Sequence, residues 1–470
     1  MNSSRSRAVV ALFASCALLA ACAVGPDYRR PDPATPEQWH EALPHDGSAG
    51  VMAQWWAQFD DPLLAQLIDV AQHDNPGLNQ ALARIAQSRA GVAAARSALF
   101  PVLDANALAQ RSGGENVASQ RLGRATLDAG WEIDLFGAKR RGREAAQARY
   151  EGAQAQWHDA RVSLAAEVAQ EYVGLRSCEA LVRSLDEDLA SRLESERLTQ
   201  LKVDVGFGAP ADGALAMASS ADAATRLNAQ QAECDISVKA LVALTGLGEA
   251  NLRDRLAARR GVLPVPAQFS ILQLPAQTLM QRPDMAAAER ELAAASAEIG
   301  VAEAARYPSL TLSGSIGLQN LRTGGVTLDG SLWSFGPSLN LPIFDAGRRA
   351  ANAEGAQARY DEARAAYEGK ARQAVREVEQ SLVRLNSASR REGDAKRAAD
   401  GYEKAYQAAN DLWRVGAGSM LDLEVARRIA VSARIQLLGV QRERVAAWIG
   451  LYRAAGGGWL ATDRIDGVAL

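Results

Sequence analysis

The sequence predicts an α+β fold with an internal two-fold repeat. An alanine-rich helix begins at Arg282-Pro283-Asp284 and runs to Tyr307-Pro308, where polar and apolar residues start to alternate as in a strand. The same change from helix to strand occurs after Phe100-Pro101. Two short motifs then recur in the same order, Gln147-Ala-Arg-Tyr with Gln357-Ala-Arg-Tyr and Val205-Gly-Phe-Gly with Val415-Gly-Ala-Gly. We therefore expect one structural unit to occur twice.

The N-terminus has the features of a secretory signal. Two arginines precede an apolar run over residues 8–20, which is too short for a permanent membrane helix. The run ends at Leu19-Ala-Ala-Cys22, which resembles the lipobox of bacterial lipoproteins. We therefore expect residues 1–21 to be removed and Cys22 to be acylated; the alternative is an ordinary signal peptide with an incidental cysteine. Ala23, in place of an aspartate, is what this resemblance associates with sorting to the outer membrane.

Composition limits the domain organisation and the partners. The chain has 470 residues with a formal net charge of −3, and its acidic and basic residues are interleaved, so nothing suggests a nucleic-acid partner. Apart from the signal, no apolar run approaches the roughly 20 residues of a membrane-spanning helix. We expect an irregular lead-in over residues 22–50 and the two repeats over residues 51–260 and 261–470.

Each half contains two segments with the alternation of β-strands. We expect strands at about residues 102–112 and 124–136 in the first half and at about 309–320 and 327–344 in the second. Leucine, isoleucine and tryptophan alternate in them with serine, threonine, aspartate and glutamate. Since successive side chains of a strand point to opposite faces, one face of each strand is apolar and the other is polar.

These strands favour a membrane-spanning barrel over a soluble sandwich. Trp333 and Phe335 add aromatic residues to the apolar face, as in lipid-facing barrel strands near the membrane interface. Four strands are too few to close, and an open sheet edge is not tolerated in lipid. We therefore expect the chain to oligomerise, and three copies would give a twelve-stranded barrel. Asp128, Glu132 and Asp134 would line its lumen, although ordinary solvated strand residues give the same pattern.

Very long helices separate the two pairs of strands. Residues 138–205 would form a helix about 100 Å long, since each of its roughly 68 residues adds about 1.5 Å. Residues 210–245 would bring the chain back part of the way. Charges such as Arg192 and Glu194 are typical of helix surfaces, with small residues where helices pack closely. Two such hairpins per chain, six in a trimer, would line a tube.

Two cysteines remain after removal of the signal and acylation of Cys22. Cys178 and Cys234 lie equally far before and after Gly206. If the helices fold back at Gly206, the two thiols lie level with each other, in a compartment where disulfides persist. We expect a Cys178–Cys234 disulfide. The alternative is a pair of buried thiols on helix faces that do not converge.

Short motifs that resemble those of a known protein family occur over nearly the whole mature chain. They resemble those of the TolC-like outer-membrane efflux proteins, specifically the lipoprotein branch labelled NodT-type, at Val24-Gly-Pro-Asp-Tyr28, Trp55-Trp56, Arg282-Pro-Asp284, Phe344-Asp345 and Gly456-Gly-Gly-Trp459. The resemblance implies a homotrimer in the outer membrane of a Gram-negative bacterium, with a β-barrel continuous with a periplasmic α-helical barrel. It also implies an exit duct that works with a periplasmic adaptor and an inner-membrane efflux pump.

The resemblance assigns the hairpin turns to adaptor docking at the periplasmic tip. The turn residues are Val205, Gly206, Gly208, Arg414, Val415, Gly416 and Gly418. Glycine suits such turns in any case, because it can adopt the left-handed conformation that ends a helix. The alternative is therefore that these residues form the turns and contact no partner protein. In that case Arg414 only favours the C-terminus of its helix, through its positive charge.

Family members close the tube near the tip with acidic residues. Asp212 and Asp422 each follow a turn glycine by six residues, and Glu424 lies close by. A ring of carboxylates in a narrow aperture would attract cations and act as a gate. An aspartate in the first turn of a helix also stabilises the helix dipole, so both interpretations stay open. Val425 occupies a place where some relatives carry a second carboxylate.

Enzyme motifs are absent from the sequence. The histidines lack metal-ligand spacing, and neither a Cys-x-x-Cys pair nor a phosphate-binding loop nor a nucleophile elbow is present. We expect no catalytic residue, cofactor or metal. The alternative to the efflux duct is a structural or adhesive outer-membrane lipoprotein, which the paired lipid-type strands disfavour.

Overall fold

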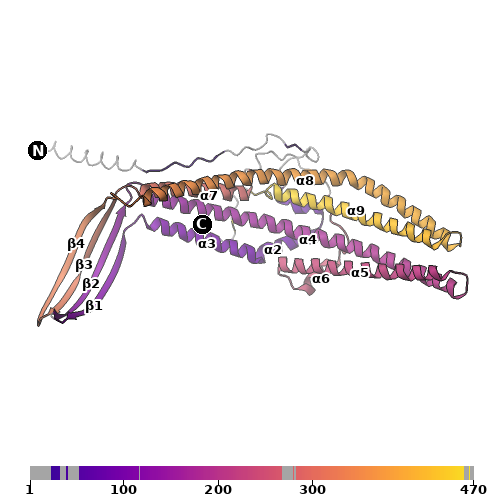
Figure 1. Ribbon diagram of the computed structural model, residues 1–470, viewed down its shortest axis with the longest axis horizontal. Helices are drawn as coiled ribbons and strands as arrows, with labels where there is room; N and C mark the ends of the chain where they lie inside the picture. Colours follow the sequence, from indigo (N-terminus) through magenta and orange to yellow (C-terminus); the bar gives the residue numbers. More distant parts are fainter. Residues whose placement is uncertain are drawn as a thin grey trace. The chain divides into compact units, whose positions relative to one another are not determined.

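The computed structural model describes residues 23–31, 39–40, 52–115, 117–266, 279, 282–459 and 465. The predicted signal, Cys22 and most of the lead-in lie outside these residues. The described elements, labelled in Figure 1, are η1 (Met52–Phe59), α2 (Pro62–Asp74), α3 (Pro76–Ser97), β1 (Val102–Gly114), β2 (Val117–Ile133), α4 (Ala138–Asp204), α5 (Pro210–Thr245), α6 (Glu249–Ala257), α7 (Pro283–Ala304), β3 (Ser309–Thr323), β4 (Val326–Asn340), α8 (Arg348–Arg414) and α9 (Met420–Ala454).

The chain divides into two compact units. The first, which we call the strand unit, comprises Met1–Pro33, Ala83–Ala155 and Ala286–Lys370. The second, the hairpin unit, comprises Ala34–Leu82, Gln156–Met285 and Ala371–Leu470. Within the described part of the chain, no helix combines the length and apolar character needed to cross a membrane.

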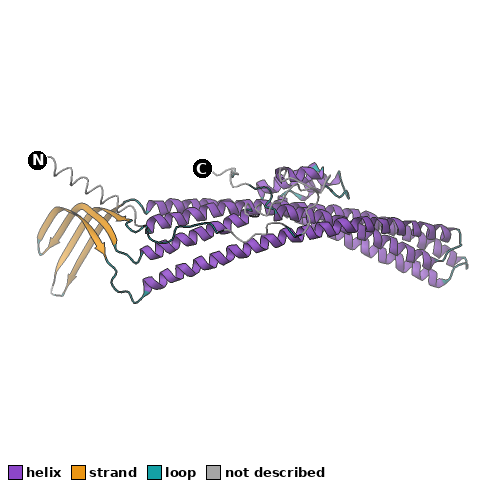
Figure 2. Ribbon diagram, turned by 90° about the horizontal axis from the view of Figure 1, so that it is seen from above, coloured by secondary structure: helices purple, strands orange, loops and turns teal. Residues whose placement is uncertain are grey.

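One four-stranded antiparallel sheet, with strand order β1-β2-β3-β4, lies in the strand unit. Figure 2 shows it as a single curved sheet. The two hairpins have tight turns, since Gly114 pairs with Val117 and Thr323 pairs with Val326. Positive φ angles at Gly324 (58°) and Gly325 (83°) suit such a two-residue turn.

The predicted ends of the strands differ from those in the structure. The second strand begins at Val117, not near residue 124, because the tight turn lets β1 and β2 pair through a stretch that resembles a polar loop. A register shift between Ser112 and Gly114 accommodates this pairing. The same strand ends at Ile133 instead of residue 136, and the fourth strand ends at Asn340 instead of residue 344.

Cross-strand pairing aligns like residues on each face of the sheet. Leu127, Ile316 and Trp333 pair across β2, β3 and β4, and their side chains are 49%, 62% and 78% exposed. The neighbouring row consists of Asp128 paired with Ser315, which pairs with a serine on β4. The predicted division into an apolar and a polar face is therefore confirmed across three strands.

The hairpin unit contains the larger part of two antiparallel helical hairpins, α4–α5 and α8–α9, whose long helices α4 and α8 begin in the strand unit (Figure 1). Its core includes aromatic side chains from distant segments: Trp55 stacks on Trp448 with ring centroids 4.4 Å apart. The hydroxyl of Tyr172 donates a hydrogen bond of 2.8 Å to Asp61, which also caps α2. The start of the unit is thus fixed to α9 by ring packing and to α4 by a buried hydrogen bond.

The Arg282-Pro-Asp284 motif has a structural explanation within the hairpin unit. Arg282 is 5% exposed and donates to the Ala454 carbonyl at 2.9 Å, to Glu377 at 2.7 Å and to Asp284 at 2.9 Å. Burial lowers the pKa of Arg282, but its bonds to Asp284 and Glu377 raise that pKa overall. The motif therefore fixes the start of α7 to the end of α9 and to α8.

Candidate functional site

The two hairpin turns have the same backbone geometry. Gly206 N–H donates to Val203 O at 3.0 Å, and Gly416 N–H donates to Trp413 O at 3.0 Å. The next residue in each turn donates to a carbonyl five positions earlier, at 2.8 Å and 2.9 Å. Both glycines have a φ of 78°. Each long helix therefore ends in a Schellman motif, with glycine supplying the left-handed residue.

Apolar side chains are exposed at both turns. Val205 is 58% exposed and Phe207 88% in the first turn, while Val415 is 78% exposed in the second, followed by Leu421 at 60%. Arg414 is exposed as well. Gly208 and Gly418 pack against the preceding helices, where a Cβ atom would come within 3.0 Å of Val203 N and 3.1 Å of Trp413 N. The turns thus present apolar groups that the described chain does not cover.

The two aspartates of the predicted gate lie in first helical turns, Asp212 in α5 and Asp422 in α9. Ser419 Oγ accepts a hydrogen bond of 3.1 Å from Asp422 N–H and donates one of 2.6 Å to the Asp422 carboxylate. This reciprocal pair is a helix-capping arrangement. Asp422 therefore has the structural role that was the alternative to gating, while half-buried Asp212 makes no side-chain hydrogen bond to any described residue.

Glu424, the third residue of the predicted gate, is buried and paired. Its side chain is 10% exposed and accepts hydrogen bonds from Arg192 at 2.8 Å and from Ser219 at 2.5 Å. It also pairs with Arg427. These contacts turn the carboxylate inward between α4, α5 and α9, and a role of Glu424 in a gate stays a prediction.

The same contacts correct the interpretation of Arg192 as a surface charge. Its side chain is 5% exposed and pairs with Asp188 at 2.9 Å as well as with Glu424. On the other side, Arg427, 2% exposed, donates to Ser195 at 2.8 Å. We call Asp188, Arg192, Glu424 and Arg427 the inter-hairpin ion cluster. The spacing of Asp188 to Arg192 was a visible sign of a local pair, but nothing in the sequence placed α9 beside them.

The structure joins Cys178 of α4 to Cys234 of α5 by a disulfide. The sulfur atoms are 2.04 Å apart and the Cα atoms 5.6 Å apart. The bond therefore links the two helices of the first hairpin at the level that the spacing around Gly206 predicts. No corresponding pair of cysteines exists in the second hairpin.

The three acidic residues predicted for a barrel lumen lie in different places. Asp128 is on the polar face of β2 and accepts hydrogen bonds from Asn106 at 2.7 Å and Thr126 at 2.8 Å. Glu132, on the same face, pairs with Lys139 at 3.0 Å.

Asp134 lies beyond the end of β2, so its predicted place on the strand is wrong. Its carboxylate accepts from the backbone N–H groups of Lys139 and Arg140, at 3.1 Å and 2.9 Å. It satisfies free donors at the start of α4, which explains why the strand stops before it. Among the residues that the structure describes, no group of three or more His, Cys, Asp or Glu side chains is placed to hold a metal ion.

Comparisons with known proteins agree with this architecture. Residues 67–247 and 274–457 each match the family described as outer membrane efflux protein. The chain is 30% identical over 449 residues to a nodulation protein T of Rhizobium leguminosarum bv. viciae, covering 94% of this chain and 92% of the relative. It is 32% identical over 455 residues to the outer membrane protein OprJ of Pseudomonas aeruginosa, covering 94% of each.

Solved structures give the same result. The outer-membrane channel OprN resembles this structure with a TM-score of 0.82 and 32% sequence identity, over 93% of this chain and 100% of that one. The double match also agrees with the repeat that the recurring motifs predict. The chain therefore belongs to the outer membrane efflux protein family and is an outer-membrane efflux channel.

Proposed function

We propose that three copies of the chain close a twelve-stranded barrel in the outer membrane and form the exit duct of a tripartite efflux system. The observation that carries this proposal is the sheet itself. Its apolar face exposes large side chains such as Trp333, and its edge strands β1 and β4 have no partner within the described chain. Such edges need pairing in lipid, which neighbouring copies supply.

The partners in this proposal are a periplasmic adaptor at the hairpin turns and, through it, an inner-membrane pump. The exposed apolar residues of both turns support docking there, because Phe207 and Val415 lie at the apex of rigid Schellman turns. Arg414 would add a polar contact at the rim. Asp212 and Asp422 would form the acidic constriction, while Ser419 caps the helix that begins with Asp422 in its first turn.

Cys22 would anchor the chain through its acyl groups. Ala23, the first described residue, lies against Gly137, where an added Cβ would come within 3.1 Å of the Ala23 Cβ. Val24 N–H donates to Phe136 O at 3.1 Å. The residues that follow Cys22 therefore lie at the junction of β2 and α4, which supports an anchor at the membrane surface if the strands span the bilayer.

Conductance in planar bilayers tests the duct with two matched variants on β4. Phe335→Arg places a charge on the apolar face, and Ser334→Arg places the same charge on the polar face. We expect current steps from the native chain and from Ser334→Arg. Phe335→Arg should insert poorly, since a cation on the lipid face costs about 2–4 kcal/mol at the midplane.

The outcome separates the duct from the structural or adhesive lipoprotein. A folded, oligomeric native protein that carries no current would favour that alternative. Equal insertion of Phe335→Arg and Ser334→Arg would show that the apolar face of β4 does not meet lipid.

A further inference from the structure

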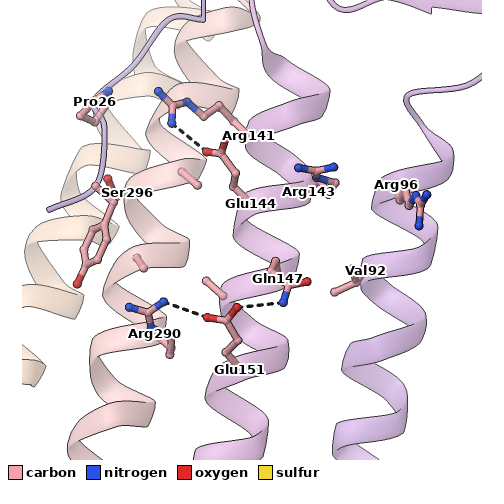
Figure 3. A pocket seen from close by; sticks show the side chains of 14 residues that line it. Pro26, Val92, Arg96, Arg141, Arg143, Glu144, Gln147, Glu151, Arg290 and Ser296 are labelled. Carbon is pink, nitrogen blue, oxygen red and sulfur yellow. Dashed lines mark hydrogen bonds and ion pairs between the residues drawn. The ribbon is translucent and has the colours of Figure 1, made fainter. Parts of the chain in front are cut away.

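A cavity of 540 Å³ in the strand unit is lined by residues of the N-terminal segment, α3, α4 and α7 (Figure 3). Four arginines and two glutamates line it: Arg96, Arg141, Arg143, Arg290, Glu144 and Glu151. The rest of the lining is largely small or apolar, including Val92, Ala148 and Ala293. The cavity thus has more arginines than carboxylates on its lining, next to an apolar wall.

Two of the arginines are neutralised by partners. Arg141 pairs with Asp27 at 2.7 Å and with Glu144 at 2.9 Å. Arg290 pairs with Glu151 at 3.0 Å and with Glu289 at 2.6 Å. Burial lowers the pKa of each arginine, but the bonds to these carboxylates raise it overall. Arg141 and Arg290 therefore stay charged, and the two glutamates that line the cavity are already paired with them.

The other two arginines have no such partner. Arg96 and Arg143 form no hydrogen bond or ion pair with any residue that the structure describes, and both are exposed. Figure 3 shows Arg143 projecting from α4 towards α3, the helix that carries Arg96. Arg141 is 8% exposed, and its Nε atom finds no acceptor among the described residues. The unpaired guanidinium groups of Arg96 and Arg143, both on the lining of this cavity, can donate to an anion with several oxygens.

The cavity lies next to the junctions between strands and helices. Arg96 is in the last turn of α3, shortly before β1, and Arg141 and Arg143 are near the start of α4, which follows β2. Phe136 stacks on Tyr307 at the same junction, with ring centroids 4.7 Å apart. Aromatic and basic residues together are typical of a membrane–water interface. The N-terminal segment, which would follow the acylated Cys22, forms one wall through Pro26 and Tyr28.

The N-terminal wall of the cavity is firmly held. Gly25 has a φ of 95° and lies so close to α7 that a Cβ would come within 2.4 Å of Gly300 Cα. Tyr28 donates a hydrogen bond of 2.5 Å to Glu289, and burial, followed by this bond, raises the pKa of Tyr28. Gly25 and Tyr28 therefore fix the N-terminal segment against α7 at this wall of the cavity.

We propose that this cavity binds the phosphate of an anionic glycerophospholipid from the periplasmic leaflet, with Arg96 and Arg143 donating to its oxygens. The apolar wall and the adjacent anchor favour a lipid over free phosphate, since the lipid supplies apolar groups as well as the anion. This inference rests on the proposed placement of the strands in the membrane.

Native mass spectrometry of the delipidated full-length oligomer tests the site. Phosphatidylglycerol, phosphatidylcholine and inorganic phosphate would be added separately to the native chain and to an Arg96→Gln/Arg143→Gln variant. The control is Arg372→Gln/Arg390→Gln, which removes two exposed arginines from α8 in the hairpin unit. We expect phosphatidylglycerol binding to fall about 10- to 30-fold in the first variant only, since each arginine contributes about 1 kcal/mol.

Three results would overturn the proposal. The first is equal binding of phosphatidylglycerol by both variants, and the second is retention of inorganic phosphate in place of the lipid. The third is loss of the oligomer in Arg96→Gln/Arg143→Gln, which would assign these arginines to contacts between copies. Planar-bilayer conductance of the same variant tests the lipid site separately from the efflux duct. Loss of lipid binding with normal conductance would leave the proposed duct intact.

Discussion

Buried charges link the two hairpins at the scale of single residues. The inter-hairpin ion cluster places Arg192 of α4 against Glu424 of α9, and Arg427 of α9 against Ser195 of α4. Arg427 also lies over the ring of Tyr406 of α8, with its guanidinium carbon 5.5 Å from the ring centroid. Each charge depends on the others, because an unpaired buried ion is far more costly than an exposed one.

Glu424→Gln should destabilise the hairpin unit by about 3–5 kcal/mol, because it leaves Arg192 and Arg427 with too little negative charge around them. The matched control on the same helix is Glu443→Gln, whose partner Arg391 lies 2.6 Å away in an exposed pair. That change should cost at most about 1 kcal/mol. Urea unfolding of the detergent-solubilised protein, followed by its helical signal, compares the two. Equal midpoints would show that the cluster does not hold the hairpins together.

Residue roles were the part that the sequence predicted least well. The positions of Asp212 and Asp422 followed from their distance to the turn glycines, but Glu424 belongs to a different set of contacts. Alternation alone predicts that Asp134 lies on a strand, whereas its hydrogen bonds place it at the start of α4. In each case the deciding partner comes from the next element, or from a helix distant in sequence, which local patterns do not reveal.

Elements were predicted more reliably, because their signals are local. Glycine at a required left-handed position fixed both hairpin turns, and proline marked the ends of helices ahead of β1 and β3. The start of the second strand was missed, since residues 117–123 look like loop sequence and become a strand only by pairing with β1 and β3. Strand propensity depends on such neighbours more than helix propensity does.

The disulfide should stabilise the first hairpin by restricting the unfolded chain. Cys178 and Cys234 are 56 residues apart, so the entropic model gives about 4 kcal/mol for closing this loop. A reducing agent should lower the thermal midpoint of the native protein and leave a Cys178→Ser/Cys234→Ser variant unchanged. Thiol alkylation of the denatured, unreduced protein should label neither cysteine; full labelling would mean that the bond is absent.

Closure of the sheet is the question at the scale of the whole molecule. The four strands leave the outer edges of β1 and β4 unpaired within the described chain, while the apolar face of the sheet is exposed. A barrel of three copies would pair both edges, since β4 of one copy can pair with β1 of the next, and its apolar face would contact lipid. The lumen would then carry the polar row that includes Asp128 and Ser315.

Cryo-electron microscopy of the detergent-purified full-length protein tests this closure most directly. We expect particles with threefold symmetry, in which β4 of each copy is hydrogen-bonded to β1 of its neighbour in one closed barrel of twelve strands. Monomers with an open sheet, or oligomers whose β1 and β4 edges do not meet, would contradict the shared barrel and with it the proposed duct.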